Sequence, residues 1–253
     1  MRTRPSTEPS AVRSGSRPAT PQALFDTVAP RYDRLNSLLS LGWDRRWRRC
    51  AARSLPLSGA ARVLDVGTGT GSLALEVARL APAGSRVVGC DLNARMLAVG
   101  RRRVQRASQD GSVCLVRCAG EALPFAGAAF DVATVAFAID DMRDRDACAA
   151  ELFRVLRPGG RVLLLELSLP DRPLLRALYR ASLRVLGLVG RLRGAEGYRH
   201  LREEVVRYRG RPAIERLLRR AGFTDHRYRC LTGGAATLHL AGRPRGNGDD
   251  RAY

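Results

Sequence analysis

A glycine-rich loop between a short apolar run and a helical segment constrains the fold of this chain more than any other feature. The loop reads DVGTGTG at residues 65–71, after the apolar run 62–66 and before a predicted helix at 72–81. Its glycines allow the backbone to turn sharply and allow a ligand to approach without an intervening Cβ. Because the spacing is G-x-G-x-G and not G-x-G-x-x-G, the loop favours a ligand that places no phosphate there.

Apolar segments with strand and helix character alternate along the rest of the chain. We expect strands at 62–66, 86–90, 112–117, 130–137 and 161–167, and one or two closing strands within 224–242. We expect helices at 72–81, 94–108, 144–156 and 211–222, and Pro158-Gly159-Gly160 breaks the third of them before strand 161–167. This alternation predicts an α/β fold, in which a parallel sheet is covered by helices on both faces.

The length of 253 residues suits one domain with short appendages. We expect a disordered leader at 1–22, rich in Arg, Ser and Pro, and a single domain over 23–242. Helical spacing predicts an N-terminal cap at 23–56 and an amphipathic helical insertion at 172–210, and 243–253 is predicted to be a flexible tail. Neither a membrane-spanning run nor a secretory signal is visible, so we expect a cytoplasmic protein.

The net charge of +20 comes entirely from arginine, because all 44 basic residues are Arg. An Arg-only, Ala-rich composition is typical of GC-rich coding, so we do not take the charge as a sign of specific nucleic-acid binding. Aromatic residues make up only 6% of the chain, which also argues against the alternative of an RNA-binding protein. The charge still favours contact with an anionic membrane surface. No Cys-x-x-Cys pair occurs among the six cysteines, which predicts reduced thiols and no metal site.

Two acidic residues beside the glycine loop suggest the ligand. Asp91 follows the second predicted strand, where a carboxylate can accept hydrogen bonds from both hydroxyls of an adenosine ribose. Asp65 can fix the loop or bind the ammonium group of a ligand. With the loop residues Gly67, Gly69 and Gly71, they predict S-adenosylmethionine as the cofactor. The alternative is that Asp65 only caps the loop and Asp91 is a surface residue.

Six segments make the chain similar to a known family. They read FDTVAPRYDRLNSLLSLGWDRRWRR (25–49), VLDVGTGTG (63–71), GEALPF (120–125), FRVLRPGGRVLLLELSLP (153–170), YRHL (198–201) and LTGGAATLHLAG (231–242). Over roughly residues 23–241 the chain resembles the class I methyltransferases of ubiquinone and menaquinone biosynthesis. The first and last segments are the most specific to this family. The resemblance implies a Rossmann-like, mostly parallel sheet of seven strands. It also implies S-adenosylmethionine-dependent C-methylation of a polyprenylated quinol of the demethylmenaquinol type.

The resemblance also implies cofactor contacts at matching positions. These are Thr70, Asp91, Ala119, Gly120 and Ala136, and the neighbouring Thr68 and Leu92 complete the predicted set. Tyr32 is expected to lie over the cofactor, and core packing is the alternative for this residue. The chain departs from the family at Ala119, where Asn or Asp is usual, and at Glu204, where Ser is common.

The third departure concerns the catalytic base. Asp140 and Asp141 stand where the family has an Arg-Asn pair. Either carboxylate is a candidate base for deprotonating the quinol, since ligands bind beyond the C-terminal ends of parallel strands. The alternative is that one of them caps the following helix. His200 is a second candidate base, for which packing or a surface position is the alternative. Because of these three departures from the family, the second hypothesis for function is a class I methyltransferase that acts on another small molecule.

Arginines recur every four residues in the segment 172–193, at Arg172, Arg176, Arg180 and Arg184, beside a broad Leu/Val face. Such a basic amphipathic helix can lie in a membrane interface. It can equally cover a prenyl chain as a lid, or present an ordinary solvated Arg face. The expected partners are therefore a lipid quinol and an anionic membrane surface, with oligomerisation left open.

Overall fold

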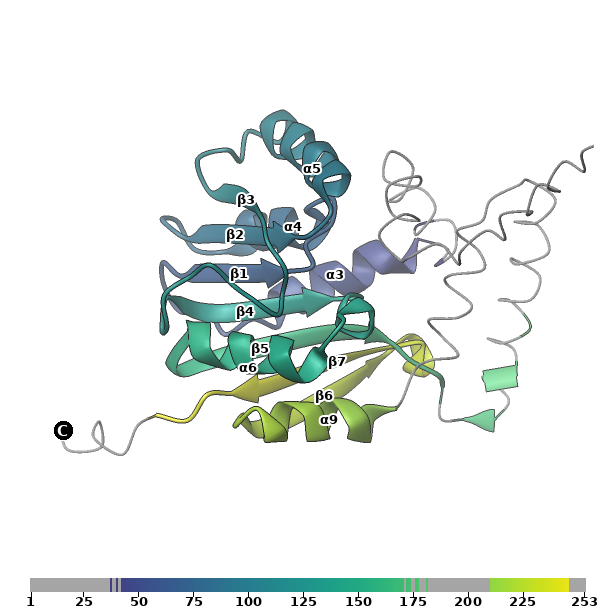
Figure 1. Ribbon diagram of the computed structural model, residues 1–253. Helices are drawn as coiled ribbons and strands as arrows, with labels where there is room; N and C mark the ends of the chain where they lie inside the picture. Colours follow the sequence, from purple (N-terminus) through teal and green to yellow (C-terminus); the bar gives the residue numbers. More distant parts are fainter. Residues whose placement is uncertain are drawn as a thin grey trace, which may run out of the picture.

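A seven-stranded sheet forms the centre of the structure, a computed structural model that describes residues 37, 40, 42–170, 172–173, 176–177, 181 and 210–245. The strands are β1 (Arg62–Val66), β2 (Arg86–Asp91), β3 (Val113–Arg117), β4 (Phe130–Ala136), β5 (Leu156–Leu167), β6 (Thr224–Leu231) and β7 (Ala236–Gly242). Their order is β3-β2-β1-β4-β5-β7-β6 (Figure 1). The first five pair in parallel, while β7 runs antiparallel to both β5 and β6. The predicted mostly parallel sheet of seven strands is confirmed.

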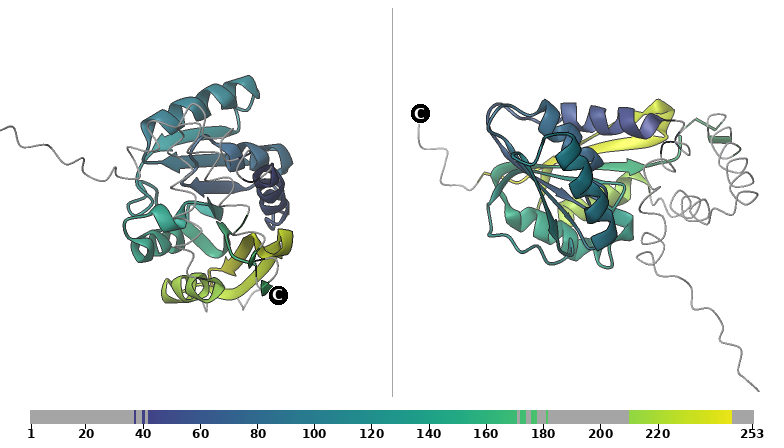
Figure 2. Two further views of the ribbon diagram at one scale, coloured as in Figure 1. Left: turned by 90° about the vertical axis from the view of Figure 1, so that its right-hand side faces the viewer. Right: turned by 90° about the horizontal axis from the view of Figure 1, so that it is seen from above.

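Helices cover both faces of the sheet, as Figure 2 shows. They are α3 (Trp43–Arg53), α4 (Ser72–Leu80), α5 (Ala94–Arg106), α6 (Arg145–Val155) and α9 (Arg211–Arg220), with 3-10 turns η2 (Ile139–Asp141) and η3 (Thr232–Gly234). One core cluster packs α3, α4 and α5 against one face, and a second packs α6 and α9 against the other. Successive strand residues face opposite sides, so Val63 belongs to the first cluster and Leu64 to the second.

Most predicted element boundaries agree with the structure to within two residues, but the start of β5 does not. The strand was expected at 161–167, and it begins at Leu156, directly after α6. Pro158-Gly159-Gly160 therefore lies inside the strand, where the pairing with β4 shifts register between Phe130 and Val132. Gly159 adopts a φ of +77°, which glycine tolerates and other residues rarely do. The glycines thus form a bulge in the strand instead of a loop before it.

Several predicted segments lie outside the described residues. These are the leader, half of the N-terminal cap 23–56, most of the insertion 172–210, and the tail beyond residue 245. Tyr32 and His200 fall in them. Among the residues that the structure does describe, no helix is long and apolar enough to cross a membrane.

Arg243, at the predicted start of the tail, joins the end of β7 to the end of α6. Its Nη1 donates to the carbonyl oxygens of Phe153, Arg154 and Leu156 at 2.6–3.1 Å, and its guanidinium lies over the Phe153 ring, 4.6 Å from the ring centroid. The last carbonyls of a helix have no partner within the helix. Arg243 therefore caps α6 from a distant part of the chain.

Replacing Arg243 by Ala should lower the free energy of unfolding by about 2–3 kcal/mol, because carbonyls at the end of α6 lose a charged donor. Urea unfolding measures this change. Arg245→Ala is the control, since Arg245 is exposed and its loss should cost less than about 0.5 kcal/mol. Equal stability of the two variants would contradict the capping role.

Candidate functional site

A cavity of about 690 Å³ opens where the glycine loop meets the C-terminal ends of β1, β2 and β4. This volume lies within the range of about 300–1,000 Å³ that is typical of small-molecule sites. The cavity brings together the predicted cofactor residues Asp65, Gly67, Thr68, Gly69, Thr70, Asp91, Leu92, Ala119, Gly120 and Ala136. Gly71 does not line the cavity and instead precedes α4 with a φ of +74°. The structure thus gathers these residues around one cavity, and their contact with a ligand stays a prediction.

The glycine loop is fixed by contacts from β2. The backbone N–H of Thr68 donates to the carbonyl of Cys90 at 2.9 Å, and that of Gly69 donates to Oδ2 of Asp91 at 2.8 Å. Gly67 has a φ of +67°, and a Cβ at this position would collide with Ala138. The loop conformation therefore requires glycine here and leaves the backbone close to the cavity.

Asp65 lies at the floor of the cavity, with 1% of its surface exposed. The hydroxyls of Thr68 and Thr134 donate to its carboxylate at 2.6 and 2.7 Å. Burial raises the pKa of Asp65 to about 6, although the two hydroxyls and the charge of Arg48 oppose this effect. The carboxylate thus ties the loop to β1 and β4 and also faces a ligand space.

Asp91 ends β2 at the cavity wall. Its carboxylate accepts hydrogen bonds from the backbone N–H groups of Gly69 and Asn93, both at 2.8 Å. Burial raises the pKa of Asp91, and these N–H groups oppose the rise. The alternative of a surface residue is therefore wrong for Asp91, because the side chain is largely enclosed and supports the loop.

The structure separates Asp140 from Asp141, although they are neighbours in η2. Asp141 lines the large cavity. Asp140 instead pairs with Arg145 at 2.6 Å and lines a second cavity of about 210 Å³ beside α6 and α9. Neither residue caps α6, because the helix begins at Arg145 and its N-cap is Asp144, which accepts from the N–H of Ala147 at 2.9 Å. The capping alternative is therefore wrong.

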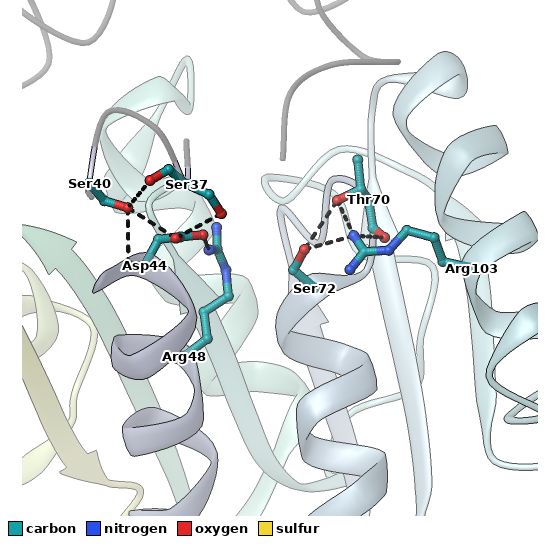
Figure 3. Close-up of polar contacts among 7 residues, drawn as sticks. All are labelled: Ser37, Ser40, Asp44, Arg48, Thr70, Ser72 and Arg103. Atoms are coloured by element: carbon teal, nitrogen blue, oxygen red, sulfur yellow. Dashed lines mark hydrogen bonds and ion pairs between the residues drawn. The ribbon is translucent and has the colours of Figure 1, made fainter. Parts of the chain in front are cut away.

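Two arginines at the site were missed by sequence reasoning, and Figure 3 shows both. Arg103 of α5 donates through Nη1 to the carbonyl and hydroxyl oxygens of Thr70 and to the hydroxyl of Ser72, at 2.8–3.1 Å. Arg48 of α3 lines the cavity and pairs with Asp44 at 2.8 Å. The four-residue spacing of Asp44 and Arg48 was a usable signal. Arg103 lies in a run of three arginines, and nothing local distinguishes it.

Solved structures share this fold. An S-adenosylmethionine-dependent methyltransferase from Thermotoga maritima superposes with a TM-score of 0.61 at 18% identity, over 87% of this chain and 98% of that chain. A methyltransferase from Haloferax volcanii, solved with its activator Trm112, gives a TM-score of 0.63 at 15% identity, over 87% and 98% of the two chains. The fold is thus the Rossmann-like fold of class I methyltransferases.

Comparison of amino-acid sequences identifies a narrower group of proteins than comparison of folds does. The model of the ubiE/COQ5 methyltransferase family matches residues 14–243. A ubiquinone/menaquinone biosynthesis C-methyltransferase of Geobacter sp. (strain M21) is 41% identical over 224 residues, which cover 87% of this chain and 94% of the relative. A demethylmenaquinone methyltransferase of Thermus thermophilus is 40% identical over 87% of this chain and all of the relative. The chain therefore belongs to the ubiE/COQ5 methyltransferase family, and it is an S-adenosylmethionine-dependent methyltransferase, as predicted.

The buried carboxylate of Asp65 should titrate near pH 6, as measured by carboxyl-carbon NMR. Thr134→Val keeps the shape of the side chain but removes one donor, so it should raise this pKa further. The folded protein holds the Asp65 proton more tightly than the unfolded chain. Protonation of Asp65 therefore stabilises the folded state. This contribution to the free energy of unfolding is complete below about pH 4 and is lost as the pH rises through about 6. Titration near the ordinary value of 3.8 would contradict the burial argument.

Proposed function

We propose that this protein C-methylates the ring of a polyprenylated quinol of the demethylmenaquinol type, with S-adenosylmethionine as the methyl donor. The observation that carries the proposal is the match to relatives named for quinone-biosynthesis C-methylation, which extends over 85–87% of this chain. The second hypothesis, another small-molecule acceptor, is not favoured by any of these relatives. The large cavity, with a volume of about 690 Å³, offers space for the cofactor and for part of the acceptor.

The residues around the cavity suit S-adenosylmethionine, which supplies a transferable methyl group on a sulfonium. Asp91, at the end of β2, is placed to accept hydrogen bonds from the ribose hydroxyls. The glycine loop allows close approach of the amino-acid part, and Asp65 offers a carboxylate to its ammonium group. Ala119 and Gly120 line the cavity beyond the end of β3. Their backbone groups can contact the adenine ring of the cofactor, whereas relatives usually have an Asn or Asp side chain at position 119.

On the acceptor side, Asp141 is the candidate base. Its position in the wall of the large cavity distinguishes it from Asp140, which lines the smaller cavity beside α6 and α9. Deprotonation of a ring hydroxyl makes the adjacent carbon nucleophilic, and the cavity must hold ring and methyl group in line. Because the acceptor carries a prenyl chain, the proposal includes contact with an anionic membrane surface, to which the net charge of +20 is attracted.

Incubation of the full chain with labelled S-adenosylmethionine and chemically reduced demethylmenaquinone tests the proposed function. We expect label in the quinone fraction, and none when the quinone is left oxidised, because the oxidised ring has no hydroxyl to deprotonate. If a preparation that still binds S-adenosylmethionine transfers no methyl group to the reduced quinone, the proposal is contradicted and another small molecule is the methyl acceptor.

Asp141→Asn should lower turnover by about 10²–10⁴-fold and leave cofactor affinity unchanged, because Asn cannot accept the proton. Asp140→Asn is the matched control, since its carboxylate serves an ion pair outside the cavity, and it should lose less than about tenfold. Single-turnover kinetics at saturating cofactor measures both. Normal turnover in Asp141→Asn would remove this residue as the base and leave His200 or water.

Asp91→Ala should weaken S-adenosylmethionine binding by about 1–3 kcal/mol, because ribose hydroxyls and the Gly69 N–H lose their acceptor. Calorimetry measures the change. Asp131→Ala is a suitable control, because Asp131 bonds the backbone of Arg62 and pairs with Arg157 at the opposite ends of the strands. Wild-type affinity in Asp91→Ala would overturn the ribose placement.

A further inference from the structure

Arg48 is a buried arginine in the wall of the cofactor cavity. It lies on the inner face of α3 with Asp44, Trp47 and Ala51, and only 9% of its surface is exposed. The other arginines that line the cavity, which are Arg95, Arg117 and Arg143, are all exposed. A guanidinium is rarely buried unless charged or polar groups compensate for the lost water.

Contacts hold Arg48 from two sides. Its Nη1 pairs with Oδ2 of Asp44 at 2.8 Å, and its guanidinium lies over the ring of Phe137 at 5.1 Å. Asp44 is in turn fixed, because the hydroxyls of Ser37 and Ser40 donate to its Oδ1 at 3.1 and 3.0 Å (Figure 3). The side chain of Arg48 is therefore positioned before any ligand binds.

These contacts use only part of the hydrogen-bonding capacity of the Arg48 guanidinium. A guanidinium carries five N–H donors. Within the part of the chain that the structure describes, Asp44 is the only carboxylate in ion-pair contact with Arg48. The positive charge of Arg48 also lowers the pKa of Asp65, so the two side chains act on the same region of the cavity. A cation and a carboxylate at one end of a cavity match a zwitterionic ligand group.

We propose that Arg48 binds the carboxylate of the methionyl part of S-adenosylmethionine, while Asp65 accepts from its ammonium group. The inference rests on the proposed function for its choice of ligand. A planar guanidinium can donate two parallel hydrogen bonds to a carboxylate, which fixes orientation as well as distance. Asp44 is a positioning residue that keeps the guanidinium turned to the cavity.

A pair of ligands isolates this contact. S-adenosylhomocysteine contains the amino-acid group, whereas 5′-methylthioadenosine has the same nucleoside and thioether without it. By calorimetry, Arg48→Gln should weaken binding of S-adenosylhomocysteine by about 10- to 100-fold and leave 5′-methylthioadenosine unchanged. Arg49→Gln is the matched control on the same helix, because Arg49 is exposed and pairs with Glu76 at 2.7 Å. This control should bind both ligands as the wild type does.

Two further variants keep the test decisive. Arg48→Lys retains the charge without the planar fork and should give an intermediate affinity for S-adenosylhomocysteine, so it replaces Arg48→Gln if that variant does not fold. Asp44→Asn should show a smaller loss that is again confined to S-adenosylhomocysteine. Equal loss of both ligands would mean that Arg48 only supports the cavity, which overturns the inference and leaves the proposed function standing. A wild-type protein that binds neither ligand would overturn both.

Discussion

The arrangement of the site depends on one buried carboxylate. Asp65 lies opposite Thr134 in the parallel pairing of β1 with β4, and the hydroxyl of Thr134 donates to it across the two strands. The hydroxyl of Thr68 donates from the glycine loop to the other oxygen. A carboxylate with 1% exposure is costly unless such donors satisfy it. The same two hydrogen bonds therefore stabilise the charge and set the direction in which the chain leaves β1.

The glycine loop is held from further sides by neighbouring elements. Asp91 at the end of β2 accepts from the N–H of Gly69, and Arg103 of α5 donates to the carbonyl of Thr70. Since these elements belong to the sheet or pack against it, the loop takes its shape from the rigid part of the fold. A loop that is ordered before binding loses less conformational entropy when a ligand arrives. The fold and the cavity are thus parts of one hydrogen-bonded arrangement.

The sequence predicts those features that local pattern determines. The strand, loop and helix around residues 62–81 were recognised because glycine spacing and apolar runs are local signals, and Asp65 and Asp91 followed from their places at strand ends. The separation of Asp140 from Asp141 was not predictable, because it depends on a 3-10 turn and on the ion pair with Arg145. The bulge in β5 was missed for a similar reason. Pro-Gly-Gly reads as a loop, whereas backbone hydrogen bonds of Gly159 and Gly160 with Arg243, just beyond β7, hold it in the strand.

Three arginines of this chain have roles in the structure that its composition does not indicate. The excess of this residue is typical of GC-rich coding. Arg48, Arg103 and Arg243 nevertheless have individual roles in the structure, because each joins segments distant in sequence or lines the cavity. Arg103 and Arg243 each donate from one terminal nitrogen to three oxygens. A lysine offers a more strongly hydrated point charge, which is harder to bury than a guanidinium. A chain whose basic residues are all arginine can therefore recruit a few of them as internal cross-links, and only the tertiary structure shows which ones.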